Sequence, residues 1–332
     1  MKRETICILL AVILLAGCGK ETLPIPQHTI ETEGCLTDPT TPPETQVVEL
    51  EPQEVLILEH AKPTVQLRAT VEAPGTLVKR GSGMVIDYSN TAQGYVMVRC
   101  ETETTQRIKV RLIGPTTTYT YNLTPLEWTA FPLSDENGVY QIVIYRNVVG
   151  TKYATVLSLT VEVTLEDPFA PFLRSNQYVN FDNAPNAVAQ AVALTVDLYD
   201  PLEKVAVIYD YVIDHLTYDQ KLASTVKSGY LPDLDQVLEK GKGICFDYAA
   251  LVTGMLRSQG IPAKLVVGYA GSVYHAWISV WTESTGWVDG VIYFDGTSWK
   301  RMDPTFASSG GRSEEIMTFI GDNTNYNAKY FY

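Results

Sequence analysis

The sequence predicts an α+β protein in which an all-β domain precedes a mixed domain of helices and strands. Two observations carry this prediction. Apolar residues alternate with period two through residues 55–165, and beyond residue 200 they recur at helical spacing. A chain of 332 residues is also long enough for two domains. We predict the boundaries 1–17, 18–54, 55–165 and 166–332.

The composition excludes some classes of protein. Hydrophobic residues make up 45% of the chain and charged residues 19%, which excludes a wholly disordered protein. The net charge of −13 argues against a nucleic-acid partner, because phosphate contacts need a basic face. The four histidines are scattered, so we expect no histidine-based metal site. We expect no cofactor.

The first segment is typical of a signal peptide. Lys2 and Arg3 precede an apolar run over residues 6–16, which is too short to span a bilayer. The run ends in Leu15-Ala16-Gly17-Cys18, which resembles the lipobox of bacterial lipoproteins. This resemblance implies cleavage before Cys18, a diacylglycerol on its thiol, and palmitate among the lipids of the anchor. The chain would then be anchored at the extracytoplasmic face of the cell membrane. An ordinary secretory signal is the alternative.

Residues 18–54 are predicted to form a disordered tether. The segment is rich in threonine, proline and glutamate and shows almost no apolar periodicity. Such a composition buries too little apolar surface to offset the entropy of ordering the chain.

Residues 55–165 are predicted to form an antiparallel sandwich of Ig-like type. Short alternating runs are separated by turn signals such as Glu136-Asn137-Gly138, as expected for strands joined by tight connections. The runs lie at 65–71, 96–100, 108–112, 139–145 and 156–163. No catalytic cluster lies among them, so we interpret this domain as a spacer or a recognition module.

A first helix is predicted to begin after Asp200. Asp200 suits the N-cap position, Pro201 the first helical position and Glu203 the closing position of a capping box. An apolar stripe at helical spacing follows, and we interpret His215 near its end as structural.

A second helix carries the candidate nucleophile. Its apolar stripe begins at Tyr248 and ends before Gly260, so Cys245 lies at or just before the helix N-terminus. The unpaired N–H groups there favour an anion and lower the pKa of a thiol. A buried structural cysteine is the alternative. Gly241 and Gly243 leave room for a substrate backbone.

A strand over residues 274–281 carries His275. A turn at 294–297 is followed by a returning strand at 299–303, which can bring Asp303 beside His275. Nucleophile, base and orienting acid then follow in the order cysteine, histidine, aspartate.

The sequence blocks around these residues resemble the transglutaminase-like superfamily. The blocks are Gly-Lys-Gly-Ile-Cys-Phe-Asp-Tyr-Ala, Leu-Arg-Ser-Gln-Gly-Ile-Pro-Ala, His-Ala-Trp and Met-Asp-Pro-Thr, in that order. The resemblance implies a papain-like fold with Cys245, His275 and Asp303 as the catalytic triad. The whole layout also resembles surface lipoproteins of Gram-positive bacteria. The interval between His275 and Asp303 is longer than in many members, and we expect residues 282–294 to form a loop or hairpin beside the site.

Trp277 and Tyr218 are the candidates for substrate contact. Trp277 shares a strand face with His275, and Tyr218 belongs to a block that resembles a family element. Both can equally be packing residues.

The leading hypothesis is a cell-surface thiol enzyme that acts on peptide-like amide bonds through a thioester. Hydrolysis, as in a thiol protease or amidase, is slightly preferred over amine transfer, as in a protein-glutamine transferase. The substrate would be a cell-wall peptide or a surface protein. The alternative is a binding or scaffold lipoprotein with the same fold and no turnover. A solute-binding lipoprotein ranks last, because the duplicated halves of a two-lobed binder are missing.

Overall fold

The structure is a computed structural model that describes residues 70–283, 285–289, 291–294, 299–302 and 325–332. The predicted signal peptide, lipobox and tether lie outside these residues. The described residues of the two predicted domains all fall within one compact unit, His60–Tyr332, so the boundary near residue 165 stays a prediction. Among the described helices, none has the length and apolar character that crossing a membrane requires.

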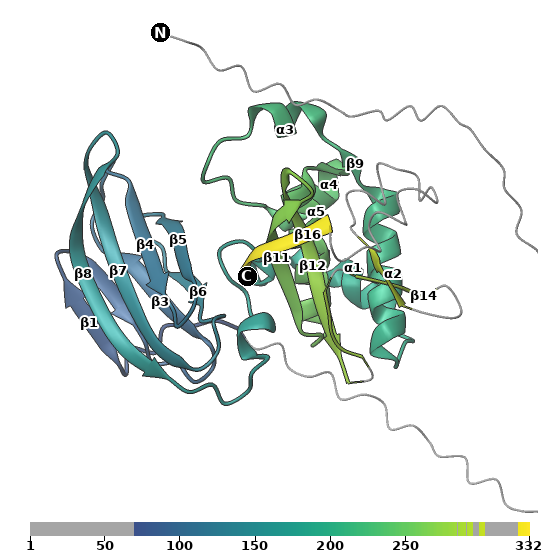
Figure 1. Cartoon of the computed structure of the whole chain (residues 1–332), viewed down its shortest axis with the longest axis horizontal. Coiled ribbons are helices and arrows are strands. Elements are labelled where there is room, and N and C mark those ends of the chain that lie inside the picture. The colour runs from purple at the N-terminus through teal and green to yellow at the C-terminus, as the bar shows by residue number, and fades with distance from the viewer. Residues whose placement is uncertain (1–69, 284, 290, 295–298, 303–324) are drawn as a thin grey trace, which may run out of the picture. The chain divides into compact units, whose positions relative to one another are not determined.

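The first half of the described chain consists of two four-stranded antiparallel sheets (Figure 1). Their strand orders are β1-β2-β3-β6 and β5-β4-β7-β8. The strands are β1 (Val78–Gly81), β2 (Met84–Asp87), β3 (Tyr95–Cys100), β4 (Ile108–Ile113), β5 (Thr118–Leu123), β6 (Thr129–Pro132), β7 (Gly138–Val149) and β8 (Lys152–Val163). The all-β character predicted for this region is therefore confirmed.

The alternation of apolar and polar residues along a strand explains how each sheet buries one of its faces. In β4, Ile108, Val110 and Leu112 are buried, while the residues between them are half-buried. Buried side chains of both sheets belong to one hydrophobic core. The strand expected at 65–71 is not found at residues 70–71, which are not in a strand. Residues 65–69 lie outside the described residues. The Ig-like type of the sandwich stays a prediction.

Helices follow in the second half of the chain, after the short 3₁₀ helices η1 (Ala170–Phe172) and η2 (Phe181–Asn183). They are α1 (Pro185–Thr195), α2 (Pro201–His215), α3 (Gln220–Thr225), α4 (Leu234–Lys240) and α5 (Cys245–Ser258). The predicted start of α2 is confirmed: the Asp200 side chain accepts a hydrogen bond from the Leu202 N–H at 2.9 Å. His215 ends α2 and bonds the Leu238 carbonyl through Nε2 at 2.7 Å, in agreement with a structural role.

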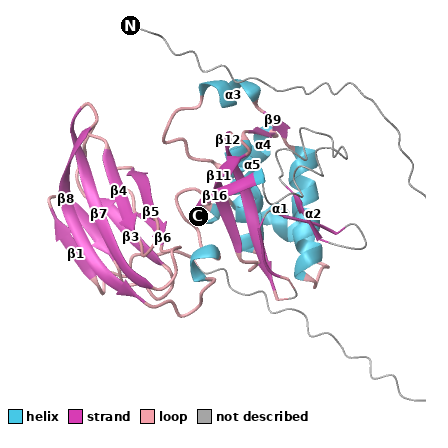
Figure 2. Cartoon of the chain, viewed as in Figure 1, coloured by secondary structure: helices cyan, strands magenta, loops and turns pink. Residues whose placement is uncertain are grey.

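The helix α5 lies at the centre of this half. It packs against α1, α2 and α4 and against the strands β11 (Ala263–Ala270) and β12 (Val273–Thr282) (Figure 2). Every residue from Asp247 to Arg257 is buried. Gly260, with φ of +75°, follows the end of the helix in the left-handed conformation that favours glycine at this position.

A four-stranded antiparallel sheet covers α5, with the order β13-β12-β11-β16. Its outer strands are β13 (Gly286–Asp289) and β16 (Tyr326–Phe331). The strand predicted at 274–281 is thus confirmed as β12. The segment expected to form a loop or hairpin begins as a hairpin, because β13 pairs with β12 from Thr282↔Gly286 to Ser279↔Asp289.

Two short strand pairs complete the fold. The strand β9 (Thr217–Tyr218) pairs in parallel with β10 (Lys242–Gly243). The strand β14 (Val291–Phe294) pairs with β15 (Trp299–Met302), which is the predicted returning strand. The antiparallel pairing of β14 with β15, from Val291↔Met302 to Phe294↔Trp299, is the pairing expected of two strands on either side of the turn predicted at residues 294–297.

Candidate active site

Cys245 is the first residue of α5, as the sequence predicts. The helix begins after Ile244, whose extended backbone forms the N-cap position. Cys245 is half-buried and its thiol is free. The first N–H groups of a helix have no partner within the helix and carry its positive dipole end. Such N–H groups can receive negative charge, as from a substrate oxygen.

The residues before Cys245 are held in a defined turn. Gly241 ends α4 with φ of +58°, a conformation that favours glycine. The chain then enters β10, where the Gly243 carbonyl accepts the N–H of Asp219 at 2.9 Å. A side chain at Gly243 would have no room, because an added Cβ would lie 2.6 Å from the Cβ of Asp247. The glycine thus allows the chain to pass directly over the Asp247 side chain.

Asp247 lies within the first turn of α5 and is completely buried. Its Oδ2 accepts the N–H of Ile244 at 2.8 Å, and its Oδ1 accepts the hydroxyl of Tyr230 at 2.7 Å. Burial raises the pKa of the Asp247 carboxyl, while both hydrogen bonds act in the opposite direction. Burial and the bond to Asp247 also raise the pKa of Tyr230.

His275 lies on β12, the strand against which α5 packs. Only 5% of its surface is exposed. It stands opposite Gly268 of β11, and its ring is nearly parallel to that of Trp277, with centroids 6.4 Å apart. An added Cβ at Gly268 would clash first with the backbone carbonyl of Asn327 in β16 and would also lie 2.9 Å from the Trp277 ring. The glycine therefore allows β16 and the Trp277 ring to lie close to β11 beside His275.

The two candidates for substrate contact occupy different surroundings. Trp277 is 2% exposed and packs edge-on against Tyr326 at 5.0 Å, as a packing residue would. Tyr218 is half-buried in β9 and pairs with Gly243, two residues before Cys245. A contact of either residue with substrate stays a prediction. Asp303, the predicted orienting acid, and Cys18, the predicted lipidation site, lie outside the described residues.

Tyr274 directly precedes His275 in β12, and the sequence analysis did not single it out. Burial of its hydroxyl raises the pKa of Tyr274, and nearby Tyr330, Tyr269 and Cys245 act in the same direction. The residue as a whole is 59% exposed, and its ring stands edge-on to that of Tyr269 at 5.5 Å. Its position directly before His275 could have drawn attention to it. Because neighbouring side chains of a strand point to opposite faces, however, the sequence does not indicate that Tyr274 lies near the site.

Further aromatic side chains adjoin the residue after Cys245. Tyr178 contacts Phe246 edge-on at 5.3 Å and Tyr332 at 4.7 Å. Burial raises the pKa of Tyr178 to about 12, so its phenol is neutral at physiological pH. The start of α5 is therefore bordered by aromatic surface.

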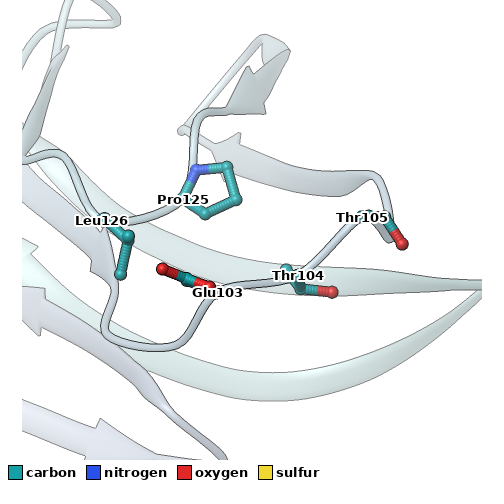
Figure 3. Close-up of a pocket in the computed structure, with 5 residues that line it drawn as sticks. All are labelled: Glu103, Thr104, Thr105, Pro125 and Leu126. Atoms are coloured by element: carbon teal, nitrogen blue, oxygen red, sulfur yellow. The ribbon is translucent and has the colours of Figure 1, made fainter.

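Two pockets lie elsewhere on the described part of the chain. One, of about 640 Å³, is lined by Glu103, Thr104, Thr105, Pro125 and Leu126 of the strand-rich half (Figure 3). No cysteine or histidine lines it, so we assign it no catalytic role. The other, of about 620 Å³, includes Tyr230 in its lining. Among the described residues no group of three potential metal ligands is found.

Comparison with known proteins places a family match over this site. Residues 188–290 match the family model of the transglutaminase-like superfamily. An uncharacterized protein YebA of Bacillus subtilis is 30% identical over 136 residues, or 34% of this chain. A protein-glutamine gamma-glutamyltransferase of Pseudomonas aeruginosa is 27% identical over 95 residues, or 24% of this chain. The matched regions span 18% and 12% of the lengths of these two relatives.

Solved structures of a cysteine protease and a transglutaminase are less similar in sequence to this chain than the two relatives above. A candidate cysteine protease from Cytophaga hutchinsonii is 16% identical, with a TM-score of 0.33 over 64% of this chain and 78% of its own. A red sea bream transglutaminase is 14% identical, with a TM-score of 0.28 over 69% of this chain and 53% of its own. The family match, which includes both Cys245 and His275, supports a transglutaminase-like superfamily domain in this chain.

Proposed function

We propose that this protein is a thiol enzyme that cleaves peptide-like amide bonds outside the cell. Cys245 is the proposed nucleophile, His275 the proposed acid and base, and Asp303 the proposed orienting group. The observation that carries the proposal is the place of Cys245 at the start of α5, a helix packed against the strand of His275. Both residues fall inside the match to the transglutaminase-like superfamily.

The proposed reaction has two steps. In the first, the Cys245 thiolate attacks the amide carbonyl carbon, His275 donates a proton to the departing amine, and a thioester forms. The N–H of Cys245 stabilises the oxyanion in the intermediate. In the second, His275 takes a proton from water or from a second amine, which attacks the thioester and releases the thiolate. Water yields hydrolysis and an amine yields a new amide.

Hydrolysis is the preferred outcome, because water is abundant at an extracellular site. Amine transfer requires an apolar surface that excludes water from the thioester and binds the amine. The aromatic surface beside Cys245, formed in part by Tyr178 and Tyr274, keeps this second outcome open.

The proposed location is the extracytoplasmic face of the cell membrane, with Cys18 as the lipid anchor. This proposal depends on the lipobox resemblance of residues 15–18. The proposed substrate class is a cell-wall peptide or a surface protein.

The test uses the full chain in detergent, with glutamine-containing peptides and cell-wall peptides, in the presence and absence of a labelled primary amine. Mass spectrometry of the products separates hydrolysis from transfer. We expect hydrolysed product that is absent with the Cys245→Ala variant. Amine incorporation that outruns hydrolysis would make the protein a transferase. No turnover of any amide would favour the alternative of a scaffold.

A further inference from the structure

The start of α5 is held by a buried pair of side chains that the proposed mechanism does not use. Asp247 receives one hydrogen bond from the chain just before Cys245 and another from the Tyr230 hydroxyl. Tyr230 lies between α3 and α4, in a segment whose other residues from Val226 to Gly229 are exposed. Two separate parts of the chain thus meet at one carboxyl group beside the candidate nucleophile.

This arrangement replaces the usual cap of a helix. A serine, threonine, aspartate or asparagine at the N-cap fixes the first turn through its own side chain, but Ile244 has no acceptor there. Asp247 instead reaches back to the N–H of Ile244 and fixes the first turn from within the helix. Tyr230 in turn fixes the orientation of the carboxyl group. Cys245 lies between Ile244 and Asp247 in the chain. The hydrogen bond between these two residues therefore forms a ring of chain that includes Cys245.

We propose that Asp247 and Tyr230 are positioning residues for Cys245, which hold the first turn of α5 so that its N–H groups converge on the thiolate. This inference rests on the proposed function, in which Cys245 is the nucleophile. Neither side chain is proposed to touch the substrate.

The charges around Asp247 are few. Asp219 raises and Lys240 lowers the pKa of the Asp247 carboxyl, and the hydrogen bonds from Ile244 and Tyr230 act more strongly than either. Loss of the Tyr230 hydroxyl therefore removes one of the two donors that hold the carboxyl group. We expect the first turn to loosen and the thiolate to lose part of its stabilisation.

The experiment measures how fast iodoacetamide alkylates Cys245 in the full chain at different pH values, with quantification of the Cys245 peptide by mass spectrometry. In Tyr230→Phe we expect alkylation near pH 7 to slow by about threefold to fivefold, with the midpoint of the pH profile moved upward. In peptide turnover we expect kcat to fall and KM to stay unchanged. Asp247→Ala should show the same changes more strongly.

Tyr140→Phe is the matched control. The Tyr140 hydroxyl is hydrogen-bonded as well, since it accepts the Asp135 N–H and donates to the Glu136 carbonyl, but Tyr140 lies in β7. We expect this control to leave the pH profile of Cys245 unchanged. An unchanged profile in Tyr230→Phe, or an equal shift in both variants, would overturn the inference. Absence of alkylation at Cys245 in the natural chain would instead overturn the proposed function.

Discussion

Arg257, near the end of α5, donates a hydrogen bond from Nη2 to the carbonyl oxygen of Tyr332 at 2.6 Å. The same guanidinium donates from Nε to the Ala263 carbonyl at 2.9 Å and from Nη1 to the Arg174 carbonyl at 2.7 Å. Burial lowers the pKa of Arg257 to about 9, which still leaves the group charged at neutral pH. One buried cation therefore joins three separate segments around α5.

Replacement of this cation should destabilise the protein. Arg257→Met removes three hydrogen bonds to carbonyl groups, of which that of Tyr332 keeps another donor, the Leu265 N–H, and we expect the free energy of unfolding to fall by about 2–4 kcal/mol. Urea denaturation measures this change. The matched control is Arg80→Met, which removes an exposed ion pair with Glu101 and should cost less than about 1 kcal/mol. Equal losses in the two variants would contradict the role assigned to Arg257.

Gly243→Ala should disturb Cys245 through Asp247. The new Cβ would meet the Cβ of Asp247 at 2.6 Å, so the chain or the helix must shift. We expect a loss of about 1–3 kcal/mol in the free energy of unfolding and slower alkylation of Cys245. Gly271→Ala is the control, since it has open space and only a positive φ of +59°. Its alkylation rate at Cys245 should match that of the natural chain.

Asp247 should make stability depend on pH in an unusual direction for an aspartate. Because its folded pKa is raised, folding disfavours the charged carboxyl, so its contribution to stability falls as the pH rises from the unfolded pKa through the folded pKa. The Asp247→Asn variant has no carboxyl group at this position, so this pH-dependent contribution to stability is absent from it. We expect the free energy of unfolding of the variant, relative to the natural chain, to increase across that range. Urea denaturation at a series of pH values measures it, and a constant difference would show that the pKa is not raised.

Asp303→Asn should slow turnover and leave the fold intact. An amide at this position no longer favours the productive tautomer and orientation of His275, and loss of the equivalent group in known triads costs up to about 10⁴-fold in kcat. Steady-state kinetics on the substrate found for the natural chain measures the loss, with circular dichroism as the check on folding. Undiminished kcat would remove Asp303 from the proposed triad.

Cys18→Ala should abolish lipid attachment. Metabolic labelling with a fatty-acid analogue is expected to mark the natural chain and not the variant. Cys35→Ala, which changes a cysteine of the predicted tether, is the control and should remain labelled. Equal labelling of the natural chain and Cys18→Ala would refute the anchor.

Elements with strong local signals could be predicted from the sequence. The N-cap at Asp200, the helix start at Cys245 and the strand of His275 all depend on residues a few positions apart, and the structure has each of them. The pairing of β14 with β15 also has a local signal, because the sequence predicts a turn at residues 294–297 and a returning strand directly after it.

Contacts between distant residues could not be predicted. Tyr230 and Asp247 belong to different elements, and only the packing of the segment before α4 against α5 brings them together. Arg257 appears in sequence as an ordinary basic residue in the last turn of a helix, where the helix dipole favours a solvated cation. Its burial follows from the position of α5 between the other helices and the sheet, which has no local signature.

The edge strand β16 has a consequence for how the chain is synthesised. It pairs with β11, yet residues 326–331 leave the ribosome long after residues 263–270. Until then β11 has an open edge rich in valine and leucine, and such edges pair readily with other chains. We therefore expect newly made chains that stop before Tyr326 to aggregate or to require a chaperone, even when α5 and the rest of the sheet are already complete.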